Sequence, residues 1–208
     1  AAPEYIARKL VRFFVVDDME PGKEMLQPLA DQLRQSDFDL GSVTRTILTS
    51  NFFNSDRAIG RKVRSPVEMG IGLLRSLGAR GNLNQLGDRL LALGHLPMYP
   101  PNVKGWDGGR QWINASTYVG RANLVREIAG QGNDRFARGS GSRAVGAKKN
   151  QEPAVWIQRM LDAWLATSVP DKTMKQLVKL GSQSAQSLDQ RVVNVISAIG
   201  ATPEYQLI

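Results

Sequence analysis

Residues 65–78, with the sequence SPVEMGIGLLRSLG, carry the start and stop signals of a single helix. Ser65 can cap the helix, Pro66 suits its first position, and Glu68 completes a capping box. Apolar residues follow at helical spacing, and Gly78 is the kind of residue that ends a helix in a left-handed conformation. The segment therefore predicts a helix over residues 66–77.

Similar patterns recur on both sides of this helix. Apolar residues repeat at intervals of three and four, which favours amphipathic helices, and Asp39 is placed to cap one of them. Pro28 either kinks its helix or marks the helix start, because an interior proline removes a hydrogen bond. The other predicted helices cover residues 4–16, 21–36, 39–50, 83–93, 115–129, 153–165, 172–180 and 188–199.

The pattern of a β-strand is missing from the sequence. The β-branched residues fall at helical spacings, and no hairpin dipeptide separates two alternating runs. We therefore predict an all-α fold, an irregular bundle of about eight helices with one long loop. A chain of 208 residues can bury roughly 70% of its unfolded surface in one core, so we expect a single helical domain over residues 1–208.

The long loop covers residues 99–116 and begins YPPNVKGWDGGRQWIN. A connection of this length without secondary structure is unusual in a compact domain, and such loops generally carry binding residues. We therefore expect the function to reside here. The candidate ligand-binding residues are Asn102, Lys104, Trp106, Asp107, Arg110, Trp112 and Asn114.

Trp106 and Trp112 have two interpretations. They could form a platform on which a sugar or another planar ligand stacks, with polar neighbours supplying hydrogen bonds. Alternatively, both rings are buried plugs that fix the loop to the helices. Solvent exposure of the rings distinguishes the two interpretations.

Catalytic residues are not identified by the sequence. A turn would bring Asp107 and Arg110 together as an ion pair, but a hydrolytic mechanism with two carboxylates needs a second acid that the local sequence does not provide. We expect His95, which follows a helix-ending glycine, to donate a hydrogen bond to a loop carbonyl. Asn114 is expected to cap the next helix.

Composition excludes several classes of site. The chain has one histidine and no cysteine. The absence of cysteine rules out disulfides, thiolate metal sites and cysteine nucleophiles. No glycine pattern of a nucleotide site is present, so we expect no cofactor and no metal. No apolar run approaches the roughly 20 residues of a membrane span, and Ala1-Ala2-Pro3 leads into a helix without the pattern of a signal peptide.

The net charge of +8 is concentrated in residues 130–150, which hold five basic residues against Asp134 alone. This segment is also rich in glycine and serine, which indicates a flexible basic loop. Such a loop attracts polyanions without specificity. Nucleic acid is not the expected partner, because no recognised nucleic-acid-binding motif is present.

A central motif comprises Pro100–Trp106, Gly109-Arg110, Trp112–Asn114 and Ser116-Thr117. It is accompanied by stretches at residues 5–10, 62–68 and 202–207. Together these motifs resemble those of a bacterial family of uncharacterised proteins, the domain of unknown function 1800. Members of that family are usually longer and exported. The resemblance therefore implies that this chain is the C-terminal part of an exported protein, located in the periplasm or at the cell surface, whose N-terminal half is a partner.

Three functional hypotheses remain open at this point. The first is a binding module that engages a polysaccharide or a cell-envelope protein through residues 99–116. The second is part of a hydrolase whose active site is completed by the N-terminal half. The third is a purely structural domain.

Overall fold

The computed structural model describes residues 1–17, 19–80, 82–130 and 140–208. These residues form α-helices and no strand, which confirms the predicted all-α fold. The short helix α7 is the only one of the ten α-helices in this part of the chain that the sequence did not predict. The helices are α1 (Ala2–Phe14), α2 (Lys23–Gln35), α3 (Leu40–Leu48), α4 (Pro66–Leu77), α5 (Leu83–Ala92), α6 (Ala115–Ala129), α7 (Gly141–Ala144), α8 (Pro153–Trp164), α9 (Asp171–Gly181) and α10 (Leu188–Gly200).

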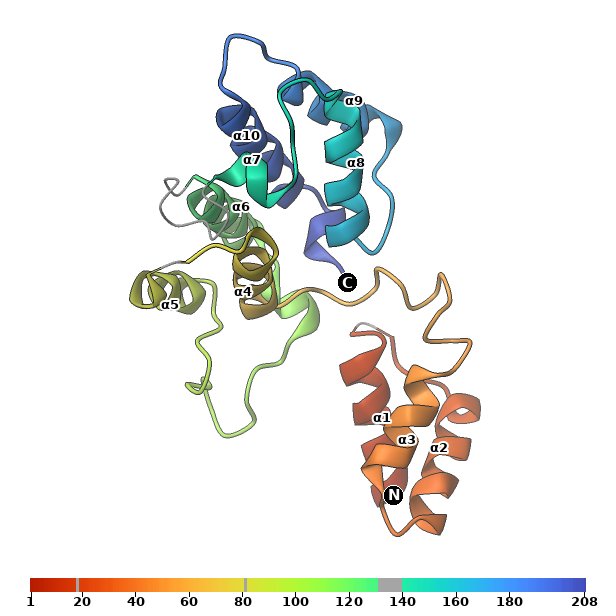
Figure 1. Ribbon diagram of the computed structural model, residues 1–208. Coiled ribbons are helices and arrows are strands. Elements are labelled where there is room, and N and C mark those ends of the chain that lie inside the picture. The colour runs from red at the N-terminus through yellow and green to blue at the C-terminus, as the bar shows by residue number, and fades with distance from the viewer. Residues whose placement is uncertain (18, 81, 131–139) are drawn as a thin grey trace. The chain divides into compact units, whose positions relative to one another are not determined.

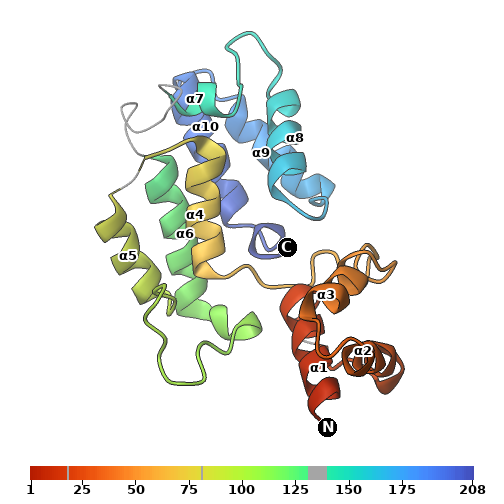
Figure 2. The same ribbon diagram turned by 60° about the horizontal axis from the view of Figure 1, so that its bottom comes forward.

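The described chain divides into two compact units. Unit 1 comprises residues 1–63 together with Ile208, and unit 2 comprises residues 64–207. Within the described residues, unit 1 contains α1–α3 and unit 2 contains α4–α10 (Figures 1 and 2). The expected single domain over residues 1–208 stays a prediction, since each unit is described by itself.

Unit 1 is built from α1, α2 and α3, which pack against one another. Its core contains Ala7, Leu33 and Val43, one from each helix and all fully buried. The carboxylate of Asp39 accepts hydrogen bonds from two backbone N–H groups at the start of α3, which confirms the predicted cap. Pro28 lies inside α2, which begins five residues earlier, so this proline does not mark the helix start.

Unit 2 has α6 and α10 at its centre. These two helices pack closely because α10 presents Gly200 to Val125 of α6: a Cβ atom at Gly200 would lie 2.4 Å from Val125 Cγ1. Helix α4 contacts α6 and α5, while α9 contacts α10 and α8. Trp156 of α8 is fully buried in the same core. The result is a helical scaffold that holds α5 and α6 in place on one side (Figure 2).

The capping residues recognised in the sequence have the predicted roles. Ser65 and Glu68 form a reciprocal capping box at the start of α4, and Gly78 ends that helix with φ at 58°. Asn114 caps α6 and forms a second box with Thr117. Both boxes satisfy backbone N–H groups that the first turn of a helix leaves unpaired.

A buried arginine joins the ends of unit 2. Arg121 of α6 donates through Nε to Gln206 Oε1 and through Nη2 to the carbonyl oxygen of Arg64, both at 2.6 Å. Burial, reinforced by the positive charge of Arg64, lowers the pKa of Arg121 to about 10. Both acceptors are neutral, so the charge is held by hydrogen bonds to uncharged oxygens.

The basic segment over residues 130–150 is described only in part. Residues 131–139, which include Arg135, Arg138 and Asp134, lie outside the described residues. Residues 140–150 contain α7, which Ser140 caps. The backbone N–H of Ser142 donates to the carboxylate of Asp189 on α10 at 2.8 Å. This contact anchors α7 to the scaffold.

Candidate functional site

The connection between α5 and α6 is the loop that the sequence singled out, and Figure 1 shows it as the yellow-green segment beside α5. Asn102 sets its first turn. The side chain of Asn102 accepts from the backbone N–H of Lys104 at 2.9 Å, and its carbonyl oxygen accepts from that of Gly105 at 3.0 Å. Asparagine stabilises turns through such local hydrogen bonds, so Asn102 has a structural role as well as a place in the site.

A pair of glycines sets the second turn of the loop. Gly108 and Gly109 have φ angles of 74° and 56°, in the left-handed region that glycine adopts without a steric penalty. They lead directly into the 3₁₀ helix η1 (Gly109–Trp112). This helix carries Trp112 inward, where its side chain is 8% exposed.

His95 contacts both tryptophans of the loop. The centroid of its imidazole ring lies 4.6 Å from that of Trp112, with the two planes 17° apart, and 4.7 Å from that of Trp106. Burial lowers the pKa of His95 from 6.5, although the negative charge of Glu68 opposes this effect. A neutral imidazole suits this apolar contact, since desolvation disfavours the charged form.

The sequence predicted that His95 hydrogen-bonds a loop carbonyl. At one of its two ring nitrogens the structure shows no such bond. Its Nδ1 atom is buried and takes no hydrogen bond within the described part of the chain. The ring is therefore placed mainly by stacking. The sequence could not predict this contact, because Trp106 and Trp112 follow His95 by more than ten residues.

Asp107 is paired with Lys104, whose ammonium group contacts its carboxylate. The sequence had suggested Arg110 as the partner of Asp107. The turn at Asn102 brings Lys104 to the required side, whereas Arg110 belongs to η1. Both members of the ion pair are more than half exposed, so the pair contributes little stability but neutralises both charges locally.

A pocket of about 310 Å³ lies between this loop and the neighbouring ends of α5 and α6. A pocket of this size can hold a small ligand or part of a larger one. Asp107 is the one carboxylate among the described residues that line it. Five of the seven candidates line this pocket, namely Asn102, Trp106, Asp107, Trp112 and Asn114, while Lys104 and Arg110 do not.

The two tryptophans of the pocket differ in exposure. Trp112 is buried, as the plug interpretation expects, whereas Trp106 is only half-buried and keeps part of its ring accessible. The structure therefore separates roles that the sequence had treated together. Trp112 fixes the loop to the scaffold, and Trp106 faces the pocket.

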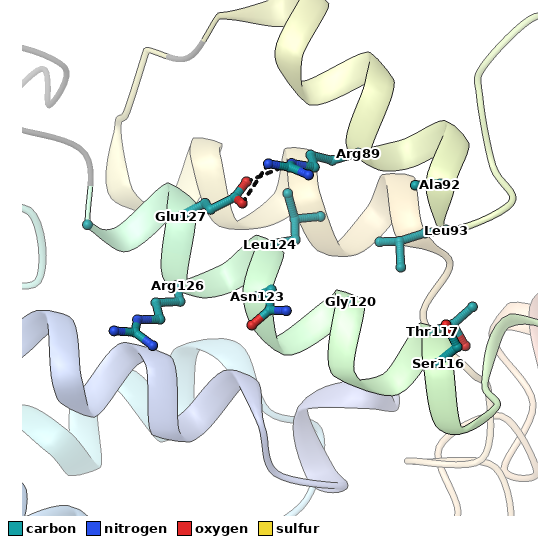
Figure 3. Close-up of a pocket in the computed structure, with 11 residues that line it drawn as sticks. Arg89, Ala92, Leu93, Ser116, Thr117, Gly120, Asn123, Leu124, Arg126 and Glu127 are labelled. Atoms are coloured by element: carbon teal, nitrogen blue, oxygen red, sulfur yellow. Dashed lines mark hydrogen bonds and ion pairs between the residues drawn. The ribbon is translucent and has the colours of Figure 1, made fainter.

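A second pocket, of about 520 Å³, lies between α5 and α6. Figure 3 shows its walls, with Arg89 on α5, Leu93 directly after α5, and Asn123 and Glu127 on α6. The sequence had not indicated it, because its lining combines two faces whose contact depends on the tertiary fold. Gln111 of the first pocket was also missed, although it lies between two candidate residues.

Comparison with protein families identifies the chain. The family model described as a protein of unknown function, DUF1800, matches residues 1–207. The chain belongs to this family. No curated protein and no solved structure gives a significant match.

The motif through which the sequence resembles the DUF1800 family coincides with the pocket of the loop. Asn102 and Trp106 belong to the motif segment Pro100–Trp106, and Trp112 and Asn114 to its later part. The motif thus supplies both the turns of the loop and the side chains that line the pocket. In this family member the structural and candidate binding roles share one segment.

Two further structural findings concern the described ranges. No helix in them has the length and apolar character needed to cross a membrane. Within the same ranges, no three acidic or histidine side chains are grouped as metal ligands would be.

Proposed function

We propose that unit 2 is a binding module that holds a segment of polysaccharide against Trp106 in the pocket of the loop. The observation that carries this proposal is the position of Trp106, which lines the pocket with a half-buried ring. The flat apolar face of an indole is a suitable support for the C–H face of a sugar ring. Contact with His95 at 4.7 Å braces the indole from within the protein.

Hydrogen-bonding groups surround this aromatic surface. Asn102 and Asn114 use their side-chain oxygens in the turn and in the helix cap. Among the described residues nothing takes up their NH₂ groups, which can donate to a ligand. Gln111 lines the same pocket. These amides can donate to and accept from sugar hydroxyl groups, as ligand sites with apolar walls and a few polar groups do.

The charge of the pocket favours a neutral ligand. Asp107 is already paired with Lys104, so neither charge needs a partner from the ligand. A neutral polysaccharide would bind with weak dependence on salt, because screening acts on interactions between charges. This supports a neutral polysaccharide, and not a polyanion, as the ligand of the loop.

The remaining hypotheses receive less support. Hydrolysis through two carboxylates needs a second acid near Asp107; the described lining residues of the pocket supply none, so this hypothesis depends entirely on the N-terminal half. A purely structural loop would bury both tryptophans, which holds for Trp112 alone. Since the family resemblance implies export, we assign the binding to the cell envelope, where a protein partner is the alternative occupant.

Electrophoresis through gels that contain soluble polysaccharides tests the proposal. Xyloglucan, glucomannan and hydroxyethyl cellulose serve as neutral probes, and heparin serves as the polyanion. We expect at least one neutral gel to retard the protein, and Trp106→Ala to abolish the retardation. Tyr99→Ala is the matched control, because Tyr99 is an exposed aromatic of the same loop that does not line the pocket.

The outcomes separate the hypotheses. Retardation that Tyr99→Ala retains and Trp106→Ala loses supports the proposal. Retardation by heparin alone, removed by added salt, would mean that basic side chains outside the pocket are responsible for the binding. If no polysaccharide retards the folded protein, the proposed function is wrong.

A further inference from the structure

The pocket of the loop and the pocket between α5 and α6 adjoin each other. Ala92, Leu93 and Thr117 line both of them. Because the two pockets share lining residues from the end of α5 and the start of α6, they are neighbours in space. The two adjoining pockets are here called the α5–α6 groove, with one part at the loop and the other between the helices.

The groove follows α6 for most of its length. Its lining runs from Thr117 near the start of α6 to Gly130 just after its end. Figure 3 shows the lining side chains in this order, from Thr117 past Asn123 to Glu127. A helix of 15 residues is about 22 Å long at its usual rise, so the groove suits an extended ligand.

The walls of the groove combine apolar and polar side chains. Leu93 and Leu124 are buried beneath it, and Asn123 lies on the adjoining face of α6. Within the described part of the chain, the Asn123 side chain makes no hydrogen bond, so its amide can serve a ligand. This combination repeats the chemistry found around Trp106.

An ion pair limits the charge inside the groove. Arg89 of α5 contacts Glu127 of α6 through two parallel contacts of 3.0 Å, from Nε and from Nη2. Such a paired arginine and carboxylate hold a fixed geometry, and Figure 3 shows them joined beside Leu124. The pair neutralises these two charges and ties the helices together, while Arg126 at the same end of the groove adds a positive charge.

We infer that the ligand is an unbranched polysaccharide whose successive units lie along the α5–α6 groove. One unit stacks on Trp106, and the following units contact Thr117 and Asn123. This inference rests on the proposed function and adds to it a second subsite and the linear form of the ligand. A branched or compact sugar would fill the first pocket and leave the groove empty.

Binding of oligosaccharides of increasing length tests the inference. The probes are cello-, xylo- and manno-oligosaccharides, each as the disaccharide and the hexasaccharide, titrated by calorimetry. We expect the hexasaccharide of one series to bind at least about tenfold more tightly than its disaccharide, because it makes contacts in both pockets. Asn123→Ala should weaken hexasaccharide binding about fivefold, the effect of one neutral hydrogen bond, and leave disaccharide binding unchanged.

Val119→Ala provides the matched control. Val119 is an exposed residue of the same helix that does not line the groove, so this variant should bind like the parent protein. Circular dichroism establishes that each variant is folded. Equal affinity for both chain lengths, with Trp106→Ala still abolishing binding, would overturn the inference and leave the proposed function intact. If no sugar of either length binds, both are wrong.

Discussion

The imidazole of His95 is stacked on the indole of Trp112, with ring centroids 4.6 Å apart and planes inclined by 17°. This contact joins His95, three residues after the end of α5, to the short helix η1 that precedes α6. It fixes the far end of the loop to its beginning. The half-buried Trp106, which also contacts His95, is thereby held at the edge of the pocket.

The stability of this cluster is expected to depend on pH. Burial lowers the pKa of His95 below 6.5, so the unfolded chain takes up the proton first as the pH falls. Stability is therefore full above pH 6.5, decreases as the pH falls from 6.5 to the folded pKa, and changes no further from this group below that pKa. Thermal unfolding between pH 5 and pH 8 measures the effect.

His95 is the one histidine of the chain, which makes the control simple. His95→Gln should remove the change in melting temperature between pH 5 and pH 7. A proton NMR titration of the single imidazole should give a midpoint below 6.5. A midpoint at or above 6.5 would contradict the burial of this ring among the tryptophans.

The turn at Gly108 is expected to tolerate no side chain. Its φ of 74° is combined with a ψ of −169°, a region that is essentially restricted to glycine. Gly108→Ala should therefore lower the free energy of unfolding by about 1–3 kcal/mol. Gly72→Ala is the matched control, since a Cβ at this helical position meets no atom within 4 Å and alanine favours helices.

Chemical denaturation of the two variants gives the comparison. Gly72→Ala should be as stable as the parent protein or more stable. Equal stability of Gly108→Ala and the parent protein would mean that the loop can form without the left-handed turn. In that case the turn would not be what directs Trp112 inward.

The close packing of α10 on α6 predicts a pair of compensating substitutions. Gly200→Ala would place a Cβ 2.4 Å from Val125 Cγ1, and overpacking of this kind costs about 1–3 kcal/mol. Val125→Ala in the same chain removes the two Cγ atoms that clash, at 2.4 and 2.7 Å, and leaves the Cβ contact at 2.7 Å. The double variant should therefore be more stable than the sum of the two single effects predicts. Strict additivity would show that these residues do not meet.

Local features of the fold were predictable from the sequence because their signals are local. Ser65 and Glu68 lie three residues apart, and Gly78 ends the helix that they begin. Asn114 likewise caps α6 through a residue three positions later. Short-range hydrogen bonds of this kind depend on residue type and spacing, which the sequence contains directly.

The contacts that build the site were less predictable because they join distant residues. Arg121 is fully buried, but its acceptor Gln206 lies 85 positions away. His95 reaches Trp112 only after the intervening loop has turned twice. The sequence identified Trp106 and Asp107 as candidates, but the α5–α6 groove follows from the tertiary structure alone.

The environment of Trp106 is the most direct test of the account. A variant with Trp156→Phe and Trp164→Phe leaves Trp106 and Trp112 as the two fluorescent reporters. The indole N–H of Trp156 donates no hydrogen bond within the described residues, so phenylalanine removes none there. Circular dichroism establishes that this variant is folded.

The measurement is the tryptophan emission of this variant during titration with neutral oligosaccharides at low and high salt. We predict a saturable shift to shorter wavelength that high salt does not abolish, because a sugar would cover the exposed part of Trp106. An emission spectrum that no neutral sugar changes, while the protein remains folded, would contradict the proposal that this loop binds a polysaccharide.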